Sequence, residues 1–113
     1  MMHVLERMPL GEDELQSAFR IELRRWGREV LLPGASQRDA EGVFDADLYR
    51  RMYTEPGING ICSAEVHGGL SERLATQLIA FEELSRFDAG YVLSYLSHSL
   101  LFCDLLEGYI SND

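Results

Sequence analysis

The sequence contains no lysine, so all ten of its basic residues are arginines, and nineteen aspartates and glutamates outnumber them. The formal net charge at pH 7 is −9. Binding to nucleic acid or to an anionic membrane depends on a basic surface that neutralises phosphate groups. The composition therefore argues against both of these partners.

Cysteine and histidine are scarce. Cys62 and Cys103 stand far apart and form no C-x-x-C motif, which predicts two free, buried thiols rather than a disulfide. His3, His67 and His98 lack the spacing of metal ligands. We therefore expect no metal site.

Complete catalytic motifs are missing as well. Gly68-Gly69 is not part of a G-x-G-x-x-G phosphate loop. His98 lies between two serines, but adjacent helical residues point in different directions, and no carboxylate stands beside His98 to orient it. The sequence thus predicts no catalytic residue.

Targeting and membrane segments are not evident. The stretch from Met1 to Arg7 lacks the apolar core of a signal peptide. The longest uncharged run, from Ala89 to Cys103, is shorter than the roughly 18 residues that a membrane span needs. We expect a cytoplasmic protein without a membrane span.

The residues after the first eleven read as a series of helices. An apolar stripe at three- and four-residue spacing predicts an amphipathic helix that ends at Pro33-Gly34. Four arginines lie mostly off this stripe and are expected on a solvated face, namely Arg20, Arg24, Arg25 and Arg28. The residues of the stripe are Leu15, Phe19, Leu23, Trp26 and Val30.

Two short helices are predicted next. Residues 36–42 favour a weak helix that breaks at Gly42. Asp45 is a plausible N-cap for a second helix, with Phe44 before it as a hydrophobic staple, and Pro56-Gly57 closes that helix.

A further helix is expected to begin at Ser71, after a short extended segment and the turn at Gly68-Gly69. Its Glu82-Glu83 pair is typical of an exposed helix face rather than of an acid/base site. One side of this helix is expected to carry Leu74, Leu78, Phe81 and Leu84.

The last helix, expected from Ala89 to Tyr109 with Asp88 as its cap, is apolar around nearly its whole circumference. Such a helix should be buried on every side, which a chain of 113 residues cannot easily achieve. Part of it should therefore face a missing domain, a partner chain or an apolar ligand.

These elements predict an all-α fold, a small up-and-down domain of about four to five helices. Residues 1–11 are expected to form a flexible tail, and residues 12–113 the helical domain.

Three segments, taken in order, resemble the N-terminal helical domain of the flavin-dependent acyl-CoA dehydrogenases. The first helix of the family is similar to residues 19–33, and its short second helix is similar to residues 44–52. The third segment resembles the family pattern Gly-Ile/Leu-x-x-Pro-Glu-x-Tyr-Gly-Gly-x-Gly. The chain keeps five of these residues, namely Gly60, Ile61, Glu65, Gly68 and Gly69.

The chain also departs from the family pattern. Ala64 replaces the usual proline, His67 a common tyrosine and Ser71 the last glycine, while Pro56 interrupts what is normally helix.

The resemblance implies a role in binding an acyl thioester. In the family this domain packs against a β-domain and a C-terminal helical bundle, and the acyl chain lies between helices over the flavin ring. The last helix resembles the one that lines that pocket. The expected substrate-binding residues are Tyr95, Leu96, Ser99 and Leu100, for which plain core packing is the alternative.

The resemblance also implies what this chain lacks. The catalytic base of the family and its main FAD contacts belong to other domains or to a neighbouring subunit. We therefore expect FAD only in the complete enzyme, none bound by this chain alone, and a partner chain or a homo-oligomer formed through the last helix.

Three hypotheses stay open at this stage. The leading one is an N-terminal part of a larger acyl-CoA dehydrogenase-like flavoenzyme, completed by another chain or by missing domains. The second is a non-catalytic interaction module that self-associates or binds a protein, which would fit the departures from the family pattern. The third is a truncated gene product without a selected function.

Overall fold

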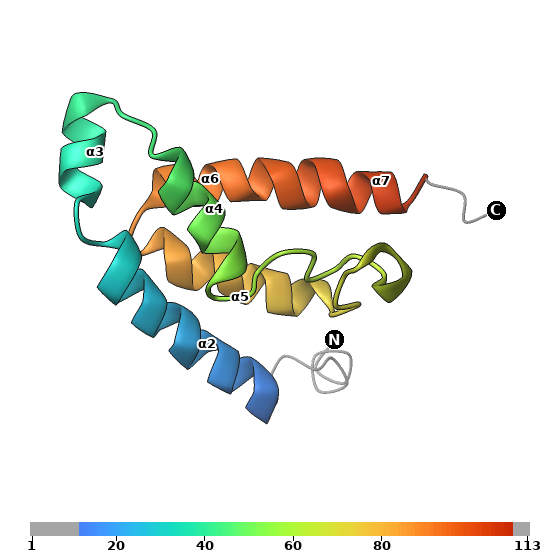
Figure 1. Cartoon of the computed structure of the whole chain (residues 1–113). Coiled ribbons are helices and arrows are strands. Elements are labelled where there is room, and N and C mark those ends of the chain that lie inside the picture. The colour runs from blue at the N-terminus through green and yellow to red at the C-terminus, as the bar shows by residue number, and fades with distance from the viewer. Residues whose placement is uncertain (1–11, 110–113) are drawn as a thin grey trace, which may run out of the picture.

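The computed structural model describes residues 12–109, so the predicted tail at residues 1–11 lies outside the described part of the chain. Within the described part there are helices, turns and loops and no strand, which confirms the all-α fold (Figure 1). The elements, in order, are α2 (Glu14–Trp26), η1 (Gly27–Leu31), α3 (Ala35–Glu41), α4 (Ala46–Thr54), η2 (Glu65–His67), α5 (Leu74–Ser85), α6 (Ala89–Leu96), η3 (Ser97–Asp104) and α7 (Leu105–Glu107).

Helix α2 begins with a complete capping box. The Asp13 side chain accepts a hydrogen bond from the backbone N–H of Gln16, and the Gln16 side chain accepts one from the backbone N–H of Asp13. The helix continues into the π-helical turn η1, and Leu23 and Leu31 are fully buried. Leu15, by contrast, is 69% exposed, so the predicted apolar stripe is not buried at its first residue.

The two short helices follow the sequence signals closely. Helix α3 ends at Gly42, whose φ of +63° is the left-handed conformation that glycine adopts without strain. Asp45 caps α4 by accepting from the backbone N–H of Leu48. The Phe44 ring lies 5.3 Å from the Tyr49 ring, which confirms the predicted hydrophobic staple.

Helix α5 starts three residues later than predicted. Its N-cap is Arg73, whereas Ser71 has a φ of +52° and belongs to the preceding loop. There the Ser71 hydroxyl accepts a hydrogen bond from the backbone N–H of Glu65. Leu74 and Leu78 are about half exposed, so only Phe81 and Leu84 of the predicted apolar side are buried.

The last three elements form one continuous helix from Ala89 to Glu107, capped by Asp88 as predicted. Helix α5 lies between α2 and this last helix (Figure 1). The expectation of surplus apolar surface is confirmed, because Leu93, Leu101 and Phe102 are each more than half exposed.

By length and composition, this helix is also long and apolar enough to cross a membrane, although the sequence argued against a span. The difference arises because the helix continues through the charged residues Asp104 and Glu107, beyond the uncharged run. A single such helix is weak evidence for a span, because buried core helices of soluble proteins are often as long and as apolar.

We expect Gly27→Ala to destabilise the fold. A Cβ at this position would lie 2.2 Å from Cδ2 of the Phe87 ring, so the ring would have to move. Overpacking of this kind lowers the free energy of unfolding by about 1–3 kcal/mol, partly offset by the better helix propensity of alanine. Urea unfolding measures the change.

Gly108→Ala is the matched control, because its nearest neighbour would be 3.5 Å away and its φ is −75°. We expect this control to stay within about 0.5 kcal/mol of the wild type. Equal losses in both variants would contradict the close contact between Gly27 and Phe87.

Candidate functional site

An open groove runs between α5 and the first turns of the last helix, with a volume of about 440 Å³. Helices α5 and α6 pack against each other on either side of the turn at residues 86–88. Side chains of both helices therefore lie along the groove. The lining residues are Leu78, Phe81, Glu82, Ser85, Ala89, Val92, Leu93 and Leu96.

The chemistry of the groove is mainly aliphatic. Phe81 and Val92 are buried, while Leu78 and Leu93 are 50% and 65% exposed. The Ser85 hydroxyl already donates to the Glu82 carbonyl oxygen. The groove therefore offers burial of apolar surface rather than hydrogen bonds. Such a groove suits an alkyl chain or an apolar protein surface.

The four predicted substrate-binding residues divide into two pairs. Leu96 lines the groove and, like Leu100, is partly buried against the core. Tyr95 and Ser99 instead point into the interior, where their exposed fractions are 0% and 5%. A direct contact between any of the four and an acyl chain stays a prediction.

Tyr95 and Ser99 belong to a small polar cluster behind the groove. The Tyr95 hydroxyl donates to the carbonyl oxygen of Ile58 at 3.0 Å, and burial raises the Tyr95 pKa to about 12. The Gln77 amide donates to the Ser99 hydroxyl and accepts from the Cys62 thiol. These contacts attach the last helix to α5 and to the loop before it.

Neither cysteine forms a disulfide, as predicted, and both thiols are partly buried. Burial raises the pKa of both Cys62 and Cys103, so neither thiol is activated as a nucleophile.

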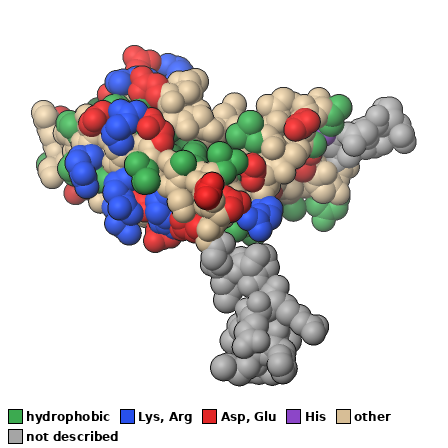
Figure 2. Space-filling model, turned by 90° about the horizontal axis from the view of Figure 1, so that it is seen from below, with side chains coloured by type: hydrophobic (Ala, Val, Ile, Leu, Met, Phe, Trp, Pro, Cys, Tyr) green, Lys and Arg blue, Asp and Glu red, His purple; other side chains and the backbone are tan. Residues whose placement is uncertain are grey.

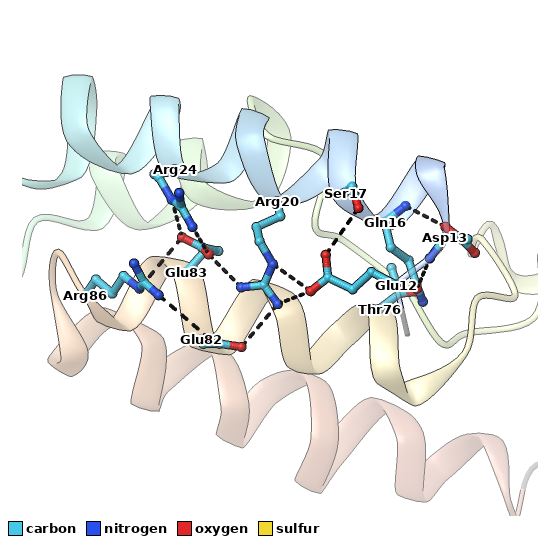
Figure 3. A network of polar contacts seen from close by, with 10 residues as sticks. All are labelled: Glu12, Asp13, Gln16, Ser17, Arg20, Arg24, Thr76, Glu82, Glu83 and Arg86. Carbon is cyan, nitrogen blue, oxygen red and sulfur yellow. Dashed lines mark hydrogen bonds and ion pairs between the residues drawn. The ribbon is translucent and has the colours of Figure 1, made fainter. Parts of the chain in front are cut away.

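A second polar cluster lies between α2 and α5 and is centred on Glu83, whose side chain is fully buried (Figure 3). Arg20 donates to the Glu83 carboxylate at 2.6 Å, and Arg24 donates to both of its oxygens at 2.8 and 3.1 Å. Arg20 also pairs with Glu12 and Glu82.

The arginines change the titration of this cluster. Hydrogen bonds from Arg24 and Arg20 lower the Glu83 pKa to about 2, against the opposing effect of burial. Hydrogen bonds to Glu12 and Glu83 raise the Arg20 pKa. Glu82 lines the groove and pairs with Arg20, so the cluster reaches the rim of the groove.

The sequence predicted the wrong environment for Glu83. It was expected on an exposed face, yet its side chain is fully buried and pairs with Arg20 and Arg24, whose side chains are 19% and 40% exposed. Arg25 and Arg28 lie on a solvated face as predicted. One available signal is that Arg20 and Arg24 are four residues apart and directly follow the core-facing Phe19 and Leu23. Two arginines beside an apolar stripe would suit a buried carboxylate.

The α5–α6 groove does not fit the pyrophosphate of FAD. The pyrophosphate of a dinucleotide needs cations or a cradle of backbone amides, whereas Glu82 is the charged residue among those that line the groove. Among residues 12–109, no group of three or more His, Cys, Asp or Glu could hold a metal ion.

Comparison with known proteins adds independent information. A family model described as the N-terminal domain of acyl-CoA dehydrogenase matches residues 13–112. The chain is 31% identical over 91 residues to the mitochondrial isovaleryl-CoA dehydrogenase of Oryza sativa subsp. japonica, covering 79% of this chain and 22% of that protein. It is 28% identical over 99 residues to the short-chain specific acyl-CoA dehydrogenase of Megasphaera elsdenii, covering 85% and 25%.

A solved structure gives the same picture of the fold. A chain from the electron transferring flavoprotein of Acidaminococcus fermentans matches with a TM-score of 0.73 and 27% identity, covering 80% of this chain and 24% of that one. The present chain therefore spans about a quarter of the length of the relatives that it matches.

We expect Glu83→Gln to lower the free energy of unfolding by about 3 kcal/mol at pH 7, because it removes the anion that two arginines neutralise. The control is Glu29→Gln, whose exposed pair with Arg25 is screened by water and should contribute far less to stability. Urea unfolding measures both.

The difference between the wild type and Glu83→Gln should also depend on pH. Because the folded-state pKa of Glu83 is about 2, below its ordinary 4.5, its stabilisation is present above about pH 4.5 and is lost as the pH falls toward 2. A difference that is the same at pH 7 and pH 3 would show that the Glu83 charge contributes nothing.

Proposed function

The chain belongs to the family of acyl-CoA dehydrogenase N-terminal domains, and from that premise we propose that it forms one wall of the acyl-thioester pocket in a larger flavoenzyme. The rest of the pocket, the catalytic base and the FAD site would come from another chain or from further domains. The reaction of the whole would be α,β-dehydrogenation of an acyl thioester.

The observation that carries this proposal is the open apolar groove on a chain that spans about a quarter of its relatives. Each methylene buried from water contributes about 0.8 kcal/mol, so an aliphatic wall is a main source of affinity for an acyl chain. Leu93 and Leu96 are the residues that we assign to this wall, while Tyr95 and Ser99 hold the helix in position from behind.

The charges at the groove favour a chain that is inactive alone. Glu82, the carboxylate on the rim, is held in an ion pair by Arg20 at 3.2 Å. General-base catalysis needs a free acceptor close to the proton that it removes. We therefore assign the base to the completing polypeptide.

A second candidate function is a non-catalytic module that self-associates or binds a protein. It is favoured by the exposed apolar residues beyond the groove, Leu101, Phe102 and Leu105. A homodimer could cover them, since two copies would bury the same face. This candidate predicts a tight homodimer without a flavoprotein partner.

Purification from the native host distinguishes the two candidates. The tagged chain is expected to elute with a second polypeptide and with the absorbance spectrum of flavin. The control is the same preparation from Leu93→Glu, which puts a charge in the groove and should reduce the yield of the second polypeptide and of flavin together.

A colourless eluate that contains this chain alone would contradict the flavoenzyme proposal. Equal yields from Leu93→Glu and from the wild type would show that the groove is not covered in the assembly.

A further inference from the structure

The far end of the last helix forms a second apolar surface, separate from the groove. Leu101, Phe102 and Leu105 are 61%, 57% and 58% exposed on η3 and α7. None of the three lines the α5–α6 groove. The proposed acyl wall therefore leaves this surface uncovered.

Asp104 lies among these apolar residues and is partly buried. Within the described residues, no arginine or histidine forms an ion pair with its carboxylate. Burial raises the Asp104 pKa, hydrogen bonding with Gln77 works in the opposite direction, and the charge of Glu107 adds to the rise. Its anion is therefore desolvated without a compensating cation.

The position of Asp104 on the helix adds to the cost of its negative charge. It lies in the last turns of a long helix, where the helix dipole favours cations and opposes anions. Glu107, one turn further on, pairs with Nδ1 of His67 at 2.8 Å and has a partner of its own. Of the two described carboxylates at this end, Asp104 is thus the one without a cationic partner.

The charged residues of this last part of the chain are mostly acidic. From Phe87 to the end of the chain there are four acidic residues and no arginine. On the face seen in Figure 2, basic side chains gather toward the end opposite α7, and the α7 end shows none. A second copy paired along this helix would bring like charges together, which is unfavourable.

We propose that this end of the last helix docks against an apolar surface of the completing polypeptide that presents an arginine or a lysine to Asp104. The inference rests on the proposed function for the existence of that polypeptide. The pairing would bury Leu101, Phe102 and Leu105 and would neutralise the carboxylate in the same step.

The probe for this surface is a synthetic amphipathic helix, roughly 18 residues long so that it is helical on binding, with one leucine face flanked by arginines. A matched peptide carries glutamate in place of every arginine. Calorimetric titration into the whole chain compares the wild type with Asp104→Asn and with Asp39→Asn. The control removes the same charge from exposed Asp39 on α3.

We expect the arginine peptide to bind the wild type at least about tenfold more tightly than Asp104→Asn, with Asp39→Asn within about twofold of the wild type. The glutamate peptide should not bind. Asp104→Asn should also raise the Tm of the chain alone, because it removes an unpaired, desolvated charge. If Asp104 were needed only for folding, Asp104→Asn would lower the Tm instead.

If Asp104→Asn and Asp39→Asn weakened binding of the arginine peptide equally, the peptide would be attracted by the overall negative charge of the chain. That result would overturn the inference. So would a wild-type homodimer, seen by sedimentation, that Leu101→Ser abolishes. These outcomes are independent of flavin. A colourless native eluate together with Asp104-dependent peptide binding would reject the flavoenzyme but keep the docking surface. An eluate that contains flavin, together with peptide binding that does not depend on Asp104, would keep the flavoenzyme but reject the docking surface.

Discussion

The buried carboxylate of Glu83, held between Arg20 and Arg24, is the interaction on which the arrangement of this domain depends. It joins α2 to α5 across residues about sixty positions apart in the sequence. A buried ion can persist only when its partners and hydrogen bonds are all in place. The register of α2 against α5 is therefore fixed by charge as well as by packing.

Helix α5 serves two surfaces because of this attachment. One side is fixed to α2 by the ion cluster, and the other forms the groove with α6 and carries Leu78 and Phe81. Glu82 connects the two, since it pairs with Arg20 and stands at the groove rim. The last helix is attached to α5 through Gln77 and Ser99, and beyond that point its apolar residues are left for a partner.

Short-range signals allowed much of the fold to be predicted. Asp45 and Asp88 cap their helices as expected, and Phe44 contacts Tyr49, because these interactions span only a few residues. The order of motifs also identified the family. The start of α5 was misplaced because Ser71 resembles an N-cap in sequence yet is held in the loop by its hydrogen bonds.

The site was harder to predict because it depends on which face of each helix packs against a neighbouring helix. Apolar periodicity cannot separate a residue that faces the core from one that faces a groove, so Leu78 and Leu84 were placed on one side although only Leu84 is buried. Likewise, the carboxylate of Glu83 could not be matched to arginines on a distant helix. Tyr95 and Leu96 are adjacent in sequence but serve the interior and the groove respectively.

The proposed pocket wall is tested most directly by the acyl-chain preference of the native assembly when the groove is narrowed. Leu93→Trp fills the proposed wall, whereas Ile21→Trp adds the same bulk at an equally exposed position of α2 outside the groove. We expect Leu93→Trp to lower kcat/KM for long acyl thioesters at least about tenfold more than for short ones, and Ile21→Trp to change neither. An unchanged chain-length profile for Leu93→Trp would contradict the claim that this groove forms a wall of the acyl pocket.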